Sequence, residues 1–308
     1  MHDAWQHAWI PIAMASALCQ TVRTAALKVL NRDLSLLVST LVRFLFGMPI
    51  LLGYALAVLV IGGEGWPRIT PAFVFWTACS SLTQSAGTAL LLSLLTLRNF
   101  AVGGIFMKAD LIFTALIGTA LFSEVISATG WFAILLAFVG VLMVSFARID
   151  TGPLGLRGTL GALLTERSTL LGLGVALTFA LSYLTLREAT LTLAPASVIH
   201  RAAWAGLLQA LLQVIFLGGW LLWKEPAGLA KMRHHLGLET FIGTISGIGT
   251  ITWFTASAMQ NSSYVAAVGQ VQVVFTLLIS WFYFRERILP LELIGIAVIV
   301  TGVLLFRF

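Results

Sequence analysis

Two charged side chains and two amides occupy matching places in apolar stretches of this 308-residue chain. Lys108 and Asp110 lie two residues apart in GGIFMKADLIFT (103–114), and Gln270 and Gln272 follow 162 positions later. An ammonium group beside amides suits a carboxylate or a phosphate, whereas a carboxylate suits an amine or a proton. Residues of these types predict a site that holds a small polar molecule.

The composition decides which solvent surrounds these side chains. The chain is 59% hydrophobic and 10% charged, with a mean hydropathy of +0.99, whereas soluble domains carry about 25% charged residues. Twenty apolar helical residues cross a hydrocarbon core of about 30 Å. We therefore predict an all-α integral membrane protein with ten transmembrane helices. Their expected ranges are 8–29, 34–61, 71–96, 100–122, 126–147, 168–190, 196–222, 236–259, 263–284 and 289–307.

An internal repeat divides the chain into two halves. When 87–146 is shifted by 162 positions onto 249–308, fifteen of sixty residues coincide, among them Gly140–Val141–Leu142 with Gly302–Val303–Leu304 and Glu124 with Glu286. We predict a first five-helix repeat over 1–150 and a second over 151–308. Because five is odd, the second repeat is inverted. Inverted repeats are typical of secondary transporters that hold the solute near the midplane.

The distribution of lysine and arginine predicts the orientation. The connections on one face carry Lys28, Arg32, Arg98, Arg148, Arg157, Arg167, Lys224, Lys231, Arg233, Arg285 and Arg287, and those on the other face carry Arg68, Arg187 and Arg307. An excess of Lys and Arg marks the cytoplasmic side, so both termini are expected outside, in a chain of the inner (plasma) membrane of a bacterium. The bias accounts for the net charge of +6 without nucleic acid.

Charges inside a membrane helix need a partner or a wet cavity, since each costs roughly 2.5–3.5 kcal/mol on insertion scales. Lys108 and Asp110 are about 200° apart on a helix, so they cannot pair with each other. One interpretation is that at least one of them faces a central cavity. The other is a buried structural ion pair in which Asp110 reaches Arg23 or Arg43.

Further polar and aromatic residues lie within the expected helices and could line the same cavity: Gln20, Gln84, Tyr183 and Trp253. Four arginines lie near expected helix ends, two in each half: Arg23, Arg43, Arg187 and Arg201. They could guard the two mouths of a pathway and attract an anionic solute. They could equally extend to the lipid headgroups or pair structurally.

The chain resembles the drug/metabolite transporter superfamily in its EamA-type branch. The resemblance covers nearly the whole chain and is carried by VRFLFG (42–47), LFSE (121–124) and YFRERI (283–288), besides the repeat. It implies ten helices and transport of small organic solutes, with both termini in the cytoplasm, opposite to the charge count. The family often has a proline where this chain has Leu111 and Val273, so a kink at these places cannot be attributed to proline.

No catalytic constellation accompanies these residues. Cys19 and Cys79 lie in separate apolar helices, and the sequence contains no G-x-x-x-x-G-K-[ST] and no H-E-x-x-H. The leading hypothesis is therefore not an enzyme but a secondary carrier of a small polar or amphiphilic metabolite, amino-acid-like or vitamin-like, without a cofactor. Its expected partners are the solute, membrane lipids and protons as coupling ion. The alternative is a membrane enzyme or flippase acting on lipid headgroups.

Overall fold

A computed structural model describes residues 7–97, 100–147, 167–285 and 287–307, and all regular elements in this part are helices. In the first half they are α2 (Trp9–Leu30), α3 (Leu36–Leu45), α4 (Met48–Gly62), α5 (Pro71–Leu95), α6 (Phe100–Phe106), η1 (Met107–Ala109), α7 (Asp110–Leu121) and α8 (Ala128–Ala147). In the second half they are α10 (Arg167–Leu191), α11 (Val198–Lys224), α12 (Pro226–Lys231), η3 (Met232–His234), α13 (Leu236–Met259), α14 (Ser262–Gly269), α15 (Val271–Phe284) and α16 (Pro290–Leu305).

Each of the ten predicted stretches is helical, with ends within a few residues of the expected ones. In the described part of the chain, eight segments are long and apolar enough to cross a membrane by length and composition. Of the other two, α16 is apolar but has only 16 residues, and α13 has 24 residues whose many Gly, Ser and Thr lower its hydropathy. The chain is an integral membrane protein.

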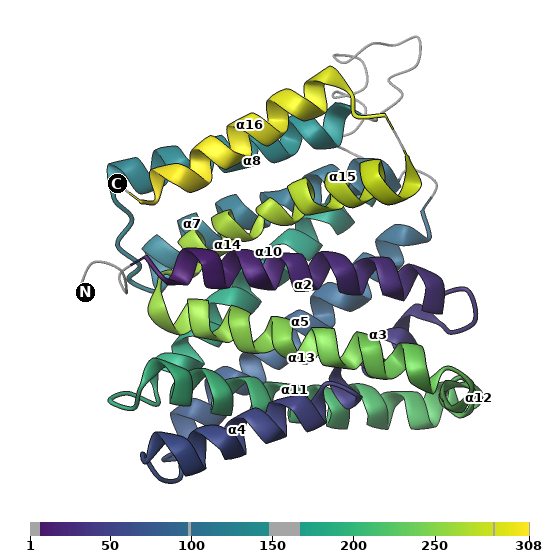
Figure 1. Cartoon of the computed structure of the whole chain (residues 1–308), viewed down its shortest axis with the longest axis vertical. Coiled ribbons are helices and arrows are strands. Elements are labelled where there is room, and N and C mark those ends of the chain that lie inside the picture. The colour runs from purple at the N-terminus through teal and green to yellow at the C-terminus, as the bar shows by residue number, and fades with distance from the viewer. Residues whose placement is uncertain (1–6, 98–99, 148–166, 286, 308) are drawn as a thin grey trace. The chain divides into compact units, whose positions relative to one another are not determined.

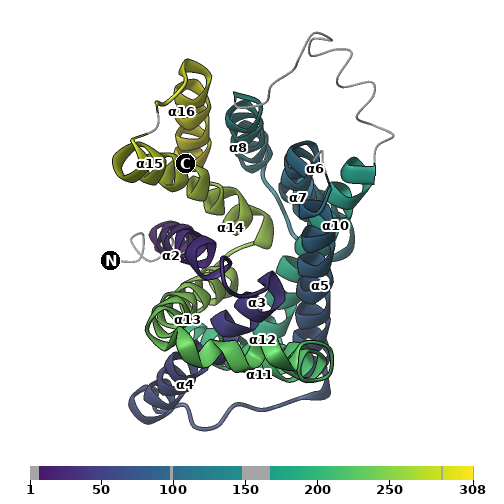
Figure 2. The same cartoon turned by 90° about the vertical axis from the view of Figure 1, so that its right-hand side faces the viewer.

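Three predicted helices are not continuous, contrary to expectation. The stretch 100–122 passes through a 3₁₀ turn, η1, between α6 and α7, and 263–284 is interrupted at Gln270 between α14 and α15 (Figure 2). The stretch 34–61 is interrupted between α3 and α4, where Gly47 directly precedes α4. The first two breaks occupy the same place in the repeat, because Lys108 and Gln270 are 162 positions apart.

The described residues pack as two compact units, and each unit combines segments from both halves of the sequence. Unit 1 comprises residues up to Leu82 together with Thr185–Gln260, and unit 2 comprises Thr83–Leu184 and residues from Asn261 onward. Helices α5 and α10 contribute to both units. The predicted repeat boundary at 150/151 divides the sequence rather than these units and stays a prediction.

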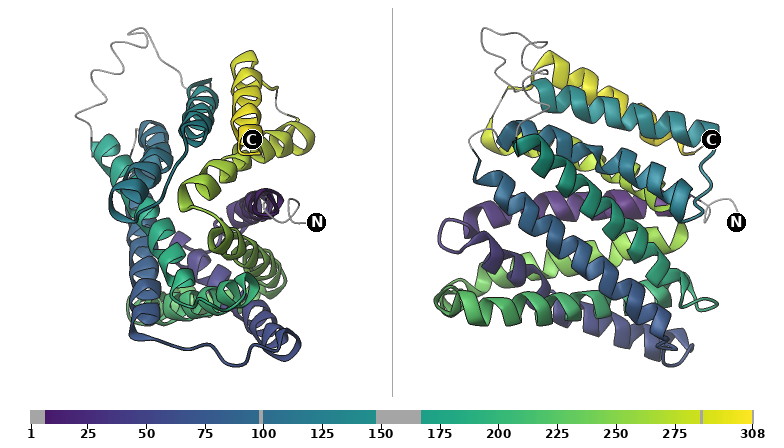
Figure 3. Two further views of the ribbon diagram at one scale, coloured as in Figure 1. Left: turned by 90° about the vertical axis from the view of Figure 1, so that its left-hand side faces the viewer. Right: turned by 180° about the vertical axis from the view of Figure 1, so that it is seen from behind.

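In unit 2, the last helices of the two halves, α8 and α16, correspond in the repeat and pack against each other. Helix α8 lies along α16 in views from both sides (Figures 1 and 3), and α7 packs against α14. A Cβ on Gly140 would lie 2.8 Å from the Gly295 carbonyl oxygen, and one on Gly302 would lie 2.9 Å from that of Ala133. The repeated Gly-Val-Leu therefore permits a close helix crossing.

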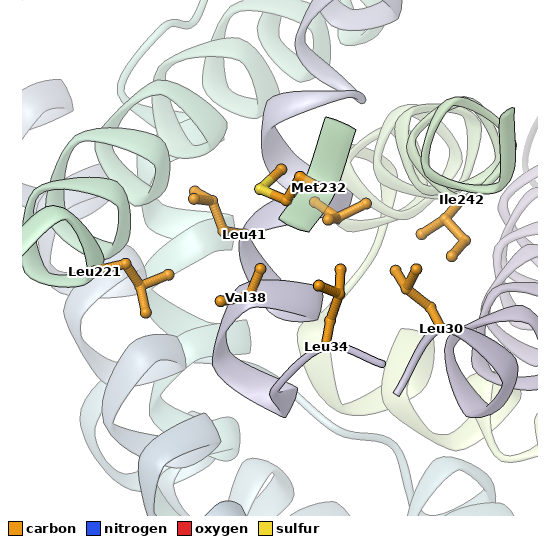
Figure 4. Close-up of a cluster of buried hydrophobic side chains, with 8 residues drawn as sticks. Leu30, Leu34, Val38, Leu41, Leu221, Met232 and Ile242 are labelled. Carbon is orange, nitrogen blue, oxygen red and sulfur yellow. The ribbon is translucent and has the colours of Figure 1, made fainter. Parts of the chain in front are cut away.

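In unit 1, α13 packs against α2, α3, α4 and α11 (Figure 1). At the junction of α2, α3, η3 and the end of α11, buried apolar side chains form a core (Figure 4). Its members are Leu30, Leu34, Val38, Leu41, Val42, Leu221, Met232 and Ile242. The core fixes the first turns of α13, because Ile242 lies on this helix.

Candidate functional site

The twelve candidate residues are all half-buried, and the two units share them equally. Unit 2 holds Lys108, Asp110, Gln270, Gln272, Gln84 and Tyr183. Unit 1 holds Gln20, Trp253, Arg23, Arg43, Arg187 and Arg201. The pair Lys108 and Asp110 and the pair Gln270 and Gln272 therefore belong to one compact unit.

Lys108 and Asp110 lie at the interruption of their helix. Lys108 is the middle residue of η1, and Asp110 begins α7. The Asp110 carboxylate accepts a hydrogen bond from the backbone N–H of Leu111 at 2.8 Å. The backbone carbonyl of Asp110 accepts one from the Thr114 hydroxyl at 2.6 Å. Among the described residues of unit 2, neither charged side chain makes an ion pair. A short polar side chain that bonds the local backbone competes with the helical pattern and favours such a break.

Gln270 and Gln272 lie at the equivalent interruption. Gln270 separates α14 from α15, and its backbone N–H donates to the backbone carbonyl of Ala267 at 3.2 Å. Gln272 lies in the first turn of α15. Tyr183 stacks with Phe179 at a centroid distance of 6.5 Å and an interplanar angle of 11°. The structure thus brings amides and a lysine to two matching helix breaks of one unit.

The candidates of unit 1 lie on several helices. Gln20 and Arg23 belong to α2, and Trp253 of α13 packs against the apolar cluster around Phe254. The Arg43 guanidinium lies over the Phe44 ring, 4.4 Å from its centroid. A cation on an aromatic face is stabilised by the ring quadrupole.

In unit 1, Arg187 and Arg201 both donate hydrogen bonds to backbone carbonyls at the end of α13. The Arg187 Nε donates to the Gln260 carbonyl at 2.9 Å, and an Arg201 terminal nitrogen donates to the Ala258 carbonyl at 3.3 Å. Both carbonyls belong to the C-terminal end of α13, where the last carbonyls lack helical partners and the helix dipole favours cations. The structural pairing considered for these arginines therefore exists, with backbone oxygens as the acceptors.

Glu124, prominent in the sequence as a repeated acid, caps a helix in unit 2. Its side chain is 3% exposed. One carboxylate oxygen accepts from the Ser262 amide at 2.6 Å, and the other accepts from the Ser263 hydroxyl at 2.6 Å and its amide at 3.3 Å. The carboxylate thereby satisfies free N–H groups at the start of α14.

Glu239 is a buried acid that the sequence analysis did not select. It lies in the first turn of α13, three residues before Ile242 of the apolar core, and is fully buried. Neither carboxyl oxygen has a hydrogen-bond partner in the described part of the chain. The missed signal was a single acid inside a segment predicted to cross the membrane, which is a functional hypothesis by default.

A connection of unit 1 carries an exposed acid with a defined partner. Glu64 follows α4, and its carboxylate accepts a hydrogen bond from the Ser197 amide at 2.8 Å. Hydrogen bonds from the side chain and the amide of Ser197 lower the pKa of Glu64 below its usual value. The same serine hydroxyl caps α11 by accepting from the His200 amide at 3.2 Å.

Metal ligands do not gather among the described residues, where no group of three His, Cys, Asp or Glu side chains could hold an ion. What the two helix breaks offer instead is a lysine, a carboxylate and two amides. These groups can bind and orient a charged or zwitterionic molecule.

Comparisons with known proteins agree with this architecture. Residues 7–146 and 167–308 each match the model of the EamA-like transporter family. One solved crystal structure is 16% identical in sequence to this chain and shares its fold, with a TM-score of 0.69 over 97% of this chain and 95% of the other. Among curated proteins, none matches the sequence. The two family matches coincide with the repeat in the sequence.

Proposed function

Because the chain belongs to the EamA-like transporter family, whose members are generally transporters of small molecules rather than enzymes, we propose that it is a secondary-active carrier. Its cargo is a small polar or amphiphilic metabolite, moved by alternating access. The observation that carries the proposal is the pair of helix breaks at equivalent places, Met107–Ala109 and Gln270. Discontinuous helices at matching positions of inverted repeats are typical of the substrate sites of carriers.

The side chains at the breaks suggest the chemistry of the cargo. Lys108 with Gln270 and Gln272 would hold a carboxylate or phosphate, and Asp110 would face an amine or carry the coupling proton. An amino-acid-like solute satisfies both groups, and a flat vitamin-like solute comes second, with Tyr183 of the same unit as a stacking partner. Gln84 completes the proposed lining in unit 2. Gln20, Trp253 and the four arginines belong to unit 1, and their predicted roles stay predictions.

The test begins with a thermal-shift screen of the purified protein against amino acids, vitamins and other metabolites. Flux of each stabilising solute is then measured in proteoliposomes with and without an imposed pH gradient. We expect Lys108→Ala and Asp110→Asn to reduce transport at least tenfold while keeping the wild-type unfolding midpoint, since each removes a charge from the site.

The matched controls are Lys231→Ala and Asp33→Asn, which change exposed residues in unit 1. Wild-type flux in both site variants would remove these residues from the mechanism. If no solute moved and fluorescent lipids crossed the bilayer instead, the flippase hypothesis would replace the carrier.

A further inference from the structure

The first two turns of α11 bury three nitrogen atoms that have no hydrogen-bond partner in the described part of the chain: Nδ1 of His200, Nε of Arg201 and Nε1 of Trp204. The His200 side chain is 2% exposed. On a helix, Trp204 is a surface neighbour of both His200, four residues before it, and Arg201, three residues before it. The rings of His200 and Trp204 lie 6.2 Å apart, so these two side chains are neighbours.

Burial without a partner is unfavourable for these groups. A buried donor that has lost water and gained no acceptor costs about 1–3 kcal/mol. Such groups in folded proteins usually mark the place of a water or an ion. The guanidinium N–H of Arg201 and the indole N–H of Trp204 are donors, and the His200 Nδ1 is a donor when it carries the ring proton. Together they point to an acceptor from outside the chain.

The charge at this end of unit 1 favours an anion. Arg187 and Glu64 are the charged side chains that act on Arg201. Two guanidinium groups are therefore accompanied by one carboxylate, and that carboxylate accepts a hydrogen bond from the Ser197 amide. Each arginine keeps further N–H groups beyond its single bond to α13.

We propose that His200, Arg201 and Trp204, together with Arg187, form a binding site for an oxyanion, a carboxylate or a phosphate group. Arginine donors match the oxygens of both groups, and the indole N–H adds a neutral donor. The ring centroid of Trp66 lies 5.5 Å from that of Trp204. The indole of Trp66 therefore offers an aromatic surface to the rest of the molecule that carries the anion. All these residues belong to unit 1, and binding of an anion there does not require transport.

The experiment uses the full-length protein in detergent. The unfolding midpoint is followed while sodium phosphate or sodium acetate replaces sodium chloride at constant ionic strength. We expect a saturable rise for the wild type. Arg201→Gln should weaken the apparent affinity about tenfold, because it removes a charge-assisted donor.

Trp204→Phe is the decisive variant, because it removes one N–H and leaves both bonds to the α13 carbonyls in place. We expect it to weaken the apparent affinity about fivefold. The matched control is Trp223→Phe, which changes an exposed indole at the other end of α11. General stabilisation by phosphate, which is excluded from protein surfaces, would be equal in both tryptophan variants.

A second arm distinguishes a free anion from a lipid headgroup. Native mass spectrometry measures retention of phosphatidylglycerol against phosphatidylcholine in the wild type and in Trp204→Phe. Saturable binding of the free anions, or selective phosphatidylglycerol retention, supports the site if Trp204→Phe reduces it and Trp223→Phe does not. Anion and lipid binding that are absent, or unchanged in Trp204→Phe, would overturn the proposal.

Discussion

Glu124 of unit 2 and Glu239 of unit 1 are equally hidden and yet differ in almost every other respect. Their side chains are 3% and 0% exposed. The Glu124 carboxylate accepts three hydrogen bonds at the start of α14, whereas neither oxygen of Glu239 has a partner among the described residues. Burial of an acid therefore does not identify its role. The number of donors that surround it does.

The difference matters for what each side chain contributes to the fold. The Glu124 carboxylate satisfies N–H and O–H groups that burial has separated from water. Glu239 makes no such bond among the described residues, so it does not hold the start of its helix in the same way.

The strongest test of the comparison removes the cap on α14. Glu124→Ala leaves two buried N–H groups without an acceptor and leaves the Ser263 hydroxyl only the Thr114 carbonyl at 3.3 Å, so we expect the free energy of unfolding to fall by about 3 kcal/mol. Equilibrium unfolding in mixed micelles measures it. Glu124→Gln, which keeps one carbonyl acceptor, should lose less. A variant Glu124→Ala as stable as the wild type would contradict the capping role.

Glu292 is a second buried acid that caps a helix. This fully buried acid accepts from the Leu289 amide at 2.8 Å at the start of α16, which is one half of a capping box. We expect Glu292→Gln to lower the free energy of unfolding by about 1 kcal/mol, since an amide oxygen is a weaker acceptor than a carboxylate. The same unfolding assay gives the value. A loss larger than that of Glu124→Ala would reverse the proposed order.

Glu239→Gln should change the free energy of unfolding by less than about 1 kcal/mol in either direction, because no hydrogen bond to the carboxyl is lost. The measurement is made at pH 7 beside Glu124→Gln. A fall as large as that of Glu124→Gln would show that Glu239 has a structural partner.

The smallest effect is expected for the exposed Glu64. Hydrogen bonds from Ser197 hold its pKa below the usual value in the folded protein. The resulting stabilisation is present above the pKa of the unfolded chain and is lost as the pH falls through the lower, folded pKa. Solvent screening keeps it small. Unfolding midpoints between pH 7 and 3.5 should fall slightly more for the wild type than for Glu64→Gln, and identical pH profiles would refute this contribution.

Local patterns were enough to predict much of this protein. Helix-length apolar runs indicate the ten helical stretches, since the length needed to cross a membrane depends on local sequence alone. The repeat aligns Lys108 with Gln270 in the sequence. The helix breaks at these residues could not be predicted, because no proline marks them and Asp110 interrupts the helix only through its own backbone contacts.

The sequence by itself determined the class of protein, the two matching halves and the residue types available for binding, because hydropathy and repetition are properties of the order of residues. Only the tertiary structure decided which buried charges are satisfied. Arg187 and Arg201 donate hydrogen bonds to backbone carbonyls at the C-terminal end of α13. Because every residue carries a backbone carbonyl, the sequence does not indicate which carbonyl an arginine will bind. Glu124 accepts from donors 138 and 139 positions away, whereas Glu239 has no donor among the described residues, because hydrogen bonds depend on distances that folding sets.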